Sequence, residues 1–385
     1  MLSLLLSLSG CTPEGRPVDT SEPADTDTDT DTDTDTDTDT DTDTDTDTDT
    51  DTDTDTGGDT VCVTTPSVML YDPPSDTWID WTKSIPTEAP GTFVALDVPG
   101  GEVRFCGGTW YARLRVEADV TISGEQGAVV HAGEVDSALR FDKDGITVDV
   151  RGLTLTGGVA TQAVGAGGVG GGGVLCSRSG GATLNLEDVV ITGNDGGNYG
   201  GGMYVDGCTV TMNDVTIEDN TAEAGAGLFV MGTTATQVRM SGSAVSDNAA
   251  SLGGGGIYVV SYQADASVAL EDTLVSGNSS GYGGGGATIS DSSIAGTSAS
   301  LSCTSTGAGP AGFLANTAAD ATLPGGGAFL ISRWGNPVSF TSTGCDFGAD
   351  GSADDNAPND VFVYGGSAYD FGDGATFGCT SGVCR

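Results

Sequence analysis

Basic side chains are scarce in this sequence. Its 385 residues contain 12 Lys and Arg against 55 Asp and Glu, which gives a formal net charge of −43. Proteins that bind nucleic acid neutralise its phosphates with a basic patch, and this composition does not supply one. The charge balance therefore excludes nucleic acid as a partner.

Three other features are missing. His131 is the only histidine, which excludes any mechanism or metal site that needs two imidazoles. The sequence contains no run of 18 apolar residues and so offers no transmembrane helix. Glycine runs are frequent, but none is followed by Gly-Lys-Ser/Thr, which excludes a phosphate-binding loop and, with it, a nucleotide partner.

Residues 1–60 are of low complexity and carry 20 acids and one base. Most of these acids belong to an unbroken Asp-Thr repeat from Asp25 to Thr56. Alternating like charges repel, and without apolar side chains to bury the repeat cannot offset its ordering entropy. We predict a disordered, extended tether over residues 11–60. A weak Ca²⁺ brush and a glycosylated threonine stalk are alternative roles for it.

The chain begins with a short apolar segment that ends in Leu8-Ser9-Gly10-Cys11. This ending resembles the lipobox of bacterial lipoproteins, in which the signal peptide is cut before a diacylated cysteine. The resemblance implies a signal peptide at residues 1–10, lipidation of Cys11 and a membrane partner through the lipid anchor. Thr12 after the cysteine implies the outer membrane of a Gram-negative bacterium. No Lys or Arg precedes the apolar segment, so an ordinary secretory signal is the alternative.

The rest of the chain repeats. Each repeat contains an asparagine followed by a glycine run, and the asparagines are spaced by 26, 28, 30 and 38 residues: Asn194, Asn220, Asn248, Asn278 and Asn316. A period of this size indicates a repeat architecture. Apolar residues alternate within each unit, as in Val210/Met212 and Val238/Met240, which is the periodicity of strands. Three short strands per unit describe one coil of a parallel β-helix, with coils about 4.8 Å apart.

Two apolar columns support this stacking. The position three residues before the asparagine (or Gly158) is occupied by Leu155, Ile191, Ile217, Val245, Val275 and Phe313. The position three after the last glycine is occupied by Val205, Val230, Val259, Ile289 and Leu330. We predict that the asparagines form a structural ladder, since stacked amides in a turn satisfy one another.

The units resemble the repeats of polymorphic outer-membrane proteins. The tetrapeptides Gly201-Gly202-Met203-Tyr204 and Gly255-Gly256-Ile257-Tyr258 carry the resemblance, which spans about residues 150–335. It implies an all-β fold, a right-handed, single-stranded parallel β-helix of the pectin-lyase-like superfold. We place an N-terminal cap at residues 61–95 and the β-helix with its C-terminal cap at residues 96–385.

Eight cysteines remain besides Cys11, and an even number in an exported chain favours disulfides. Stacking of neighbouring coils narrows the pairing to four candidates: Cys62–Cys106, Cys176–Cys208, Cys303–Cys345 and Cys379–Cys384. A zinc site is disfavoured because the sequence has no Cys-x₂-Cys pair. Buried reduced thiols are the alternative for Cys176 and Cys303, which fall at inward positions.

Asp219 and Asp247 directly precede asparagines of adjacent units, so their carboxylates are expected about 4.8 Å apart. With Glu218 they form a candidate divalent cation site, and Ca²⁺ is the ion that suits oxygen ligands in flexible geometry. The alternative is that both aspartates are solvent-exposed turn residues. No other cofactor is predicted.

Two functions from different classes fit these features. We predict a cell-surface lipoprotein that presents a rigid acidic rod for non-enzymatic adhesion or a structural role, with a surface glycan or a protein as its partner. The alternative is a polysaccharide-active enzyme, a lyase or a glycoside hydrolase, because the pectin-lyase-like fold hosts such enzymes. The only lysines, Lys83 and Lys143, precede the regular repeats, which disfavours a lyase. An exposed groove with aromatic platforms and a carboxylate pair would favour the enzyme.

Overall fold

The chain divides into two units, residues 1–57 and 58–385, and everything described below belongs to the second. The computed structural model describes residues 60–63, 65–72, 74–85, 94–98, 100–141, 143–164, 167–320, 325–348, 352–365, 368–370, 379–380 and 383–384. The predicted signal peptide, Cys11 and the Asp-Thr tether lie outside these residues.

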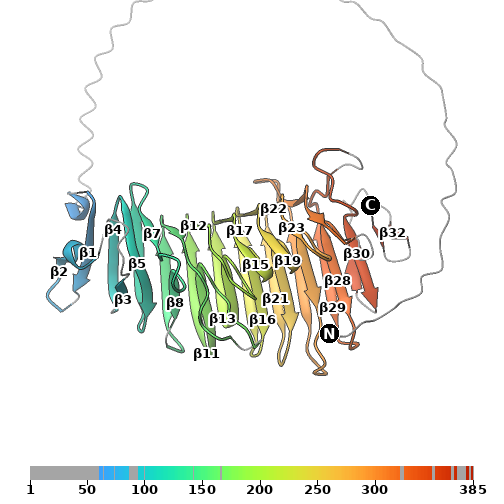
Figure 1. Cartoon of the computed structure of the whole chain (residues 1–385), viewed down its shortest axis with the longest axis horizontal. Coiled ribbons are helices and arrows are strands. Elements are labelled where there is room, and N and C mark those ends of the chain that lie inside the picture. Colours follow the sequence, from blue (N-terminus) through green and yellow to red (C-terminus); the bar gives the residue numbers. More distant parts are fainter. Residues whose placement is uncertain are drawn as a thin grey trace, which may run out of the picture. The chain divides into compact units, whose positions relative to one another are not determined.

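Short parallel strands wind through the second unit in successive coils, and each regular coil passes through three faces (Figure 1). The first face stacks β3 (Val94–Val98), β5 (Thr109–Val116), β8 (Leu139–Phe141), β11 (Val174–Glu187), β13 (Met203–Asn213), β16 (Leu228–Gly232), β20 (Ile257–Ser261), β24 (Ala287–Ser290), β28 (Ala328–Ser332) and β30 (Val361–Gly365).

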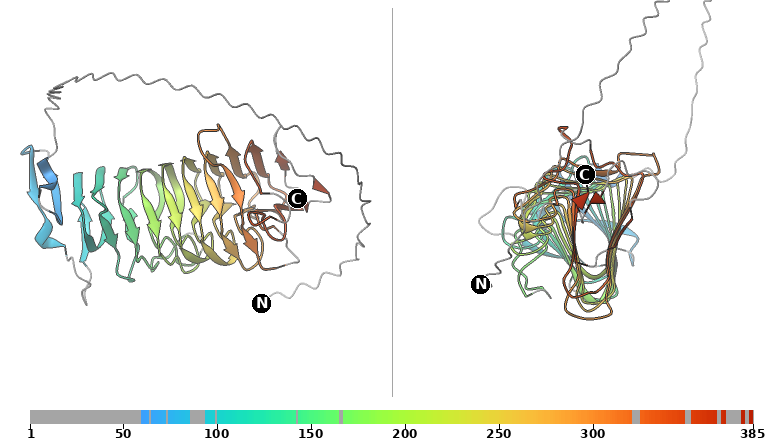
Figure 2. Two further views of the ribbon diagram at one scale, coloured as in Figure 1. Left: turned by 90° about the horizontal axis from the view of Figure 1, so that it is seen from above. Right: turned by 90° about the vertical axis from the view of Figure 1, so that its right-hand side faces the viewer.

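The long strands β11 and β13 bend from the first face into the second. The second face consists of β4 (Gly101–Cys106), β6 (Val120–Glu125), β9 (Thr147–Arg151), the later halves of β11 and β13, β17 (Thr236–Ser241), β21 (Ala266–Glu271), β25 (Ala299–Thr304), β29 (Val338–Thr343) and β31 (Ala368–Asp370). The third face consists of the start of β5, β7 (Val129–His131), β10 (Thr154–Thr156), β12 (Val190–Thr192), β14 (Thr216–Glu218), β18 (Ala244–Ser246), β22 (Leu274–Ser276) and β26 (Gly312–Leu314). In the view along the coil axis, strands of successive coils lie over one another (Figure 2). The predicted all-β parallel β-helix is confirmed.

The register of the third face confirms the first apolar column. Leu155, Ile191, Ile217 and Val245 are consecutive partners, and each side chain is fully buried. On the first face, Val205 pairs with Val230 and Val230 with Val259, which confirms the second column. Both columns belong to one continuous hydrophobic core. Inward apolar columns thus hold the coils together, since burial of each such side chain contributes about 1.5–3 kcal/mol.

Antiparallel strands are found at both ends of the stack. β1 (Ser67–Asp72) pairs with β4 and also with β2 (Thr77–Asp80), between the short 3₁₀ turns η1 (Thr60–Cys62) and η2 (Thr82–Ser84). At the other end β33 (Val383–Cys384) pairs antiparallel with β30 and with β32 (Cys379–Thr380). A strand that runs against the first or last coil occupies backbone groups on which another chain would otherwise pair.

The segment after each asparagine adds a fourth layer that the sequence did not predict. Four short strands form a separate parallel sheet: β15 (Thr221–Ala224), β19 (Ala249–Gly253), β23 (Ser279–Ser280) and β27 (Thr317–Ala318). Outward side chains of the first face pack nearby in a second hydrophobic cluster that includes Tyr204, Phe229 and Ala224. Among the described residues no helix has the length and apolarity to cross a membrane.

Candidate functional site

The five predicted asparagines lie in one column at the turn after the third face. The Oδ1 atom of Asn248 accepts hydrogen bonds from both the backbone N–H and the Nδ2 of Asn220, each at 3.0 Å. The Nδ2 of Asn248 donates in turn to Asn278 Oδ1 at 2.9 Å and to the Ile217 carbonyl at 2.9 Å. The same bonds join Asn194 to Asn220 and Asn278 to Asn316.

The ladder is longer than the sequence analysis indicated. Asn316 Nδ2 donates to Asn356 Oδ1 at 2.9 Å, and Asn356 Nδ2 donates to Asp360 Oδ1, also at 2.9 Å. At the other end, Asn194 Oδ1 accepts from the backbone N–H of Gly158. Every asparagine of the column is at most 2% exposed. The amides are therefore saturated by one another and by backbone, which leaves them a structural role.

The predicted cation residues lie next to this ladder. Asp219 and Asp247 have φ angles of 53° and 55°, in the left-handed region that Asp and Asn tolerate better than most residues. Glu218 pairs in register with Ser246, not with another acid. The described part of the chain contains no group of three or more His, Cys, Asp or Glu placed to hold a metal ion. The Ca²⁺ prediction therefore receives no support from the geometry.

Two other aspartates, Asp272 and Asp206, form hydrogen bonds to the next coil. Asp272 accepts the N–H of Thr306 at 2.8 Å and is also hydrogen-bonded by the Thr306 hydroxyl. This hydroxyl bond is the main cause that lowers the pKa of Asp272 below its ordinary value of 3.8. Asp206 accepts the N–H of Thr233 at 2.9 Å, but desolvation by burial outweighs this bond and raises the pKa of Asp206.

A groove of about 350 Å³ runs along the corner between the second and third faces. Asp214 and Asp272 line it from coils on either side of Gly242. The coil of Gly242 lies between these aspartates, so two coil spacings of about 4.8 Å place their backbones roughly 10 Å apart. A glycosidase pair needs one carboxyl group with a raised pKa to act as the acid. The pKa of Asp272 is lowered, so this residue does not have the raised pKa that such an acid needs.

An aromatic column follows the outer side of the first face. The rings of Tyr204 and Phe229 stack with centroids 5.5 Å apart, and those of Phe229 and Tyr258 stack at 5.2 Å. Tyr204 is fully buried and Phe229 is 3% exposed, since Val164 and Ala224 belong to the same cluster. Burial is also the main cause that raises the pKa of Tyr258. These rings are packed and do not form an open stacking platform.

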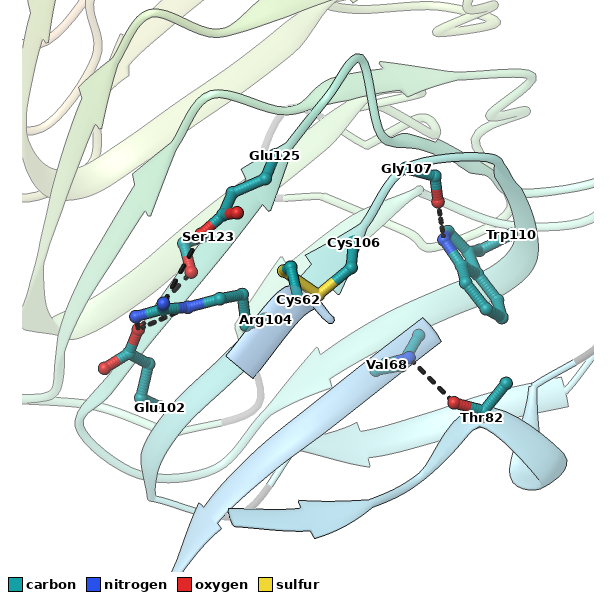
Figure 3. Close-up of a disulfide and its surroundings, with 10 residues drawn as sticks. All are labelled: Cys62, Val68, Thr82, Glu102, Arg104, Cys106, Gly107, Trp110, Ser123 and Glu125. Carbon is teal, nitrogen blue, oxygen red and sulfur yellow. Dashed lines mark hydrogen bonds and ion pairs between the residues drawn. A yellow bond between two sulfur atoms is a disulfide. The ribbon is translucent and has the colours of Figure 1, made fainter. Parts of the chain in front are cut away.

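Arginines of the first coils are engaged by carboxylates. Arg104 contacts Glu102 at 2.6 Å and Glu125 at 3.3 Å (Figure 3). Arg113 and Arg140 both reach the buried carboxylate of Asp136, at 3.5 and 3.1 Å. The charges of these three arginines are thus balanced by carboxylates of the protein itself.

Three of the four predicted disulfides are confirmed. Cys62–Cys106 joins the N-terminal segment to the end of β4 (Figure 3). Cys176–Cys208 and Cys303–Cys345 each link neighbouring coils, which makes the reduced-thiol alternative wrong for Cys176 and Cys303. Cys379 and Cys384 are partners in the antiparallel pair β32–β33, and their disulfide stays a prediction.

Comparison with known proteins agrees with this architecture. A family model for a right-handed beta helix region matches residues 171–274, from within the glycine run before β11 to the first residue of β22. The search finds no match among curated proteins and none among solved structures. The described body is therefore a right-handed parallel β-helix, a class of fold that hosts several functions.

Proposed function

We propose that this protein is a lipid-anchored display protein of the bacterial cell surface, in which a rigid acidic β-helix contacts a partner without chemical turnover. The proposal rests on one observation: asparagine and aspartate side chains that could serve in a functional site instead connect adjacent coils. Asn220 and Asn248 belong to a saturated ladder, and Asp206 and Asp272 are bound to threonines of the next coil. These hydrogen bonds use the side chains to join adjacent coils.

Anchoring belongs to the same proposal. The segment Leu8-Ser9-Gly10-Cys11 resembles a lipobox, and the Asp-Thr repeat that follows would separate the body from the membrane. With about 5–6 Å × √n of reach, roughly 45 residues span about 35–40 Å, and charge repulsion extends them further. We assign the protein to the outer membrane of a Gram-negative bacterium, with residues 11–60 as the tether.

Cell fractionation tests the anchor. We expect Cys11→Ala to release the protein from the membrane fraction and to abolish the mass increase caused by acylation. Thr12→Asp is the matched control, because it keeps the acylated cysteine and, by the Gram-negative sorting pattern, moves the protein to the inner membrane. Membrane retention of Cys11→Ala, or a wild-type mass without lipid, contradicts the proposal.

A further inference from the structure

Three exposed apolar side chains lie where the first face turns into the second, one on each of three successive coils. They are Tyr262, Ile294 and Trp334, and we call them the apolar row. Their exposed fractions are 37%, 36% and 64%. Large apolar side chains this exposed, repeated at the same turn, mark an interaction surface more often than scattered single residues do.

Buried polar side chains hold these turns in place. The carboxylate of Asp291, which is 5% exposed, accepts the backbone N–H groups of Arg333, Trp334 and Asn336 at 2.8, 2.9 and 3.2 Å. The Nδ2 of Asn336 donates to the carbonyl of Ile294 at 2.8 Å. The turn that carries Trp334 is therefore tied to the preceding coil. Such preorganisation lowers the entropy that binding would otherwise cost.

The apolar row borders a sheet surface covered with hydroxyl groups. The turns lead directly into β21, β25 and β29, whose outward residues pair in register across the three coils. These residues are Ser267, Ser300 and Ser339, then Ala269, Ser302 and Thr341, then Glu271, Thr304 and Thr343. Seven of the nine carry a hydroxyl, and Glu271 is the one charge among them. We call these nine residues the hydroxyl face.

The charge of this region differs from that of the chain. The turns of the apolar row expose one acid, Asp265, and one base, Arg333, while the whole protein has a net charge of −43. An anionic polymer, an anionic lipid surface or a second copy of this chain would be repelled by the remainder of the molecule. An uncharged partner meets no such repulsion.

We propose that the apolar row and the hydroxyl face together bind a neutral polysaccharide. The C–H faces of pyranose rings pack on Tyr and Trp rings, and sugar hydroxyls exchange hydrogen bonds with serine and threonine hydroxyls. Coils repeat every ~4.8 Å, close to the length of one pyranose unit, so successive coils offer equivalent contacts to successive sugars. This inference rests on the proposed function, for which it supplies the contact surface and the partner class.

Calorimetric titration of the full chain with neutral hexaoses tests the inference. The probes are cellohexaose, xylohexaose, mannohexaose and laminarihexaose, with an oligogalacturonate of equal length as the charged counterpart. We expect at least one neutral hexaose to bind, and Trp334→Ala and Tyr262→Ala each to weaken it about tenfold. Tyr282→Ala is the matched control, since Tyr282 is 49% exposed outside the apolar row, and its affinity should equal that of wild type.

Several results would overturn the inference. They are absence of binding to all four neutral hexaoses, tighter binding of the oligogalacturonate, and affinities that Trp334→Ala leaves unchanged. Sedimentation that shows a dimer abolished by Trp334→Ala would assign the row to a second copy. Vesicle flotation lost in the same variant would assign it to lipid. None of these results touches the Cys11 anchor, so failure here is distinguishable from failure of the proposed function.

Discussion

Asn248 shows how a single polar residue can stabilise this fold. It is fully buried, its Oδ1 accepts two hydrogen bonds from Asn220, and its Nδ2 donates to the following asparagine and to Ile217. A buried polar group costs free energy unless it is paired, so the column is stable only as a continuous ladder. Removal of the Asn248 amide leaves two donors of Asn220 without an acceptor, and it takes a donor away from Asn278 Oδ1 and from the Ile217 carbonyl.

We therefore expect Asn248→Ala to lower the free energy of unfolding by about 3 kcal/mol or more. Asn213→Ala is the control, because Asn213 is exposed on the second face and its loss should cost no more than about 0.5 kcal/mol. Urea unfolding followed by circular dichroism measures both variants. Equal stability of the two would show that the ladder does not stabilise the coils.

The sequence located most of the ladder but not its end. Five asparagines each precede a glycine run, and this recurring combination identified them in the sequence. Asn356 lies 40 residues after Asn316, but Ala357-Pro358-Asn359-Asp360 replaces the glycine run before the next strand, so periodicity alone did not reveal it. Asp219 and Asp247 were correctly placed on adjacent coils, yet their left-handed backbone depends on turn geometry that spacing does not encode.

At the scale of the element, glycine permits the coils to approach one another. Gly227 precedes β16 with an ordinary φ, so it is not required for a left-handed turn. A Cβ atom there would lie 2.6 Å from the carbonyl oxygen of Gly256 and 2.9 Å from the Nδ2 of Asn248. Both neighbours belong to the next coil, and the first is backbone that cannot move aside without disturbing the stack.

Gly227→Ala should consequently destabilise the protein by about 1–3 kcal/mol, as overpacking does in a close-packed interior. Gly309→Ala provides the comparison, because its Cβ would meet nothing nearer than the Cβ of Asp272 at 3.7 Å. Thermal unfolding of the two variants distinguishes close approach from the general effect of replacing a glycine. A lower midpoint for Gly309→Ala than for Gly227→Ala would refute this explanation.

Elements with strict periodicity were predictable, and irregular ones were not. Alternation such as Val210/Met212 identifies a strand of the second face from sequence alone. The short strands β15 and β19 have only a few residues and follow the asparagine turn, where no alternation extends far enough to indicate pairing. Likewise, the turn that exposes Trp334 depends on contacts of Asp291 with backbone 42 to 45 residues away.

At the scale of the whole molecule, the protein is an acidic right-handed β-helix whose outer side chains differ between the first, middle and last coils. Arginines of the first coils are neutralised by acids, aromatic rings of the middle coils are packed beneath the fourth layer, and the last coils expose the apolar row. Disulfides Cys176–Cys208 and Cys303–Cys345 connect neighbouring coils in two of these regions. A scaffold cross-linked in this way suits the presentation of a surface better than movement around a substrate.

Turnover is the most direct test of the central claim that this protein binds without catalysis. The full chain is incubated with the four neutral hexaoses and with polygalacturonate, and mass spectrometry follows new reducing or unsaturated ends. We predict that every saccharide stays intact at the protein concentrations used in enzyme assays, including any hexaose that binds. New ends that appear with wild type and disappear with Asp214→Asn, which removes a carboxylate from the corner groove, would contradict this account.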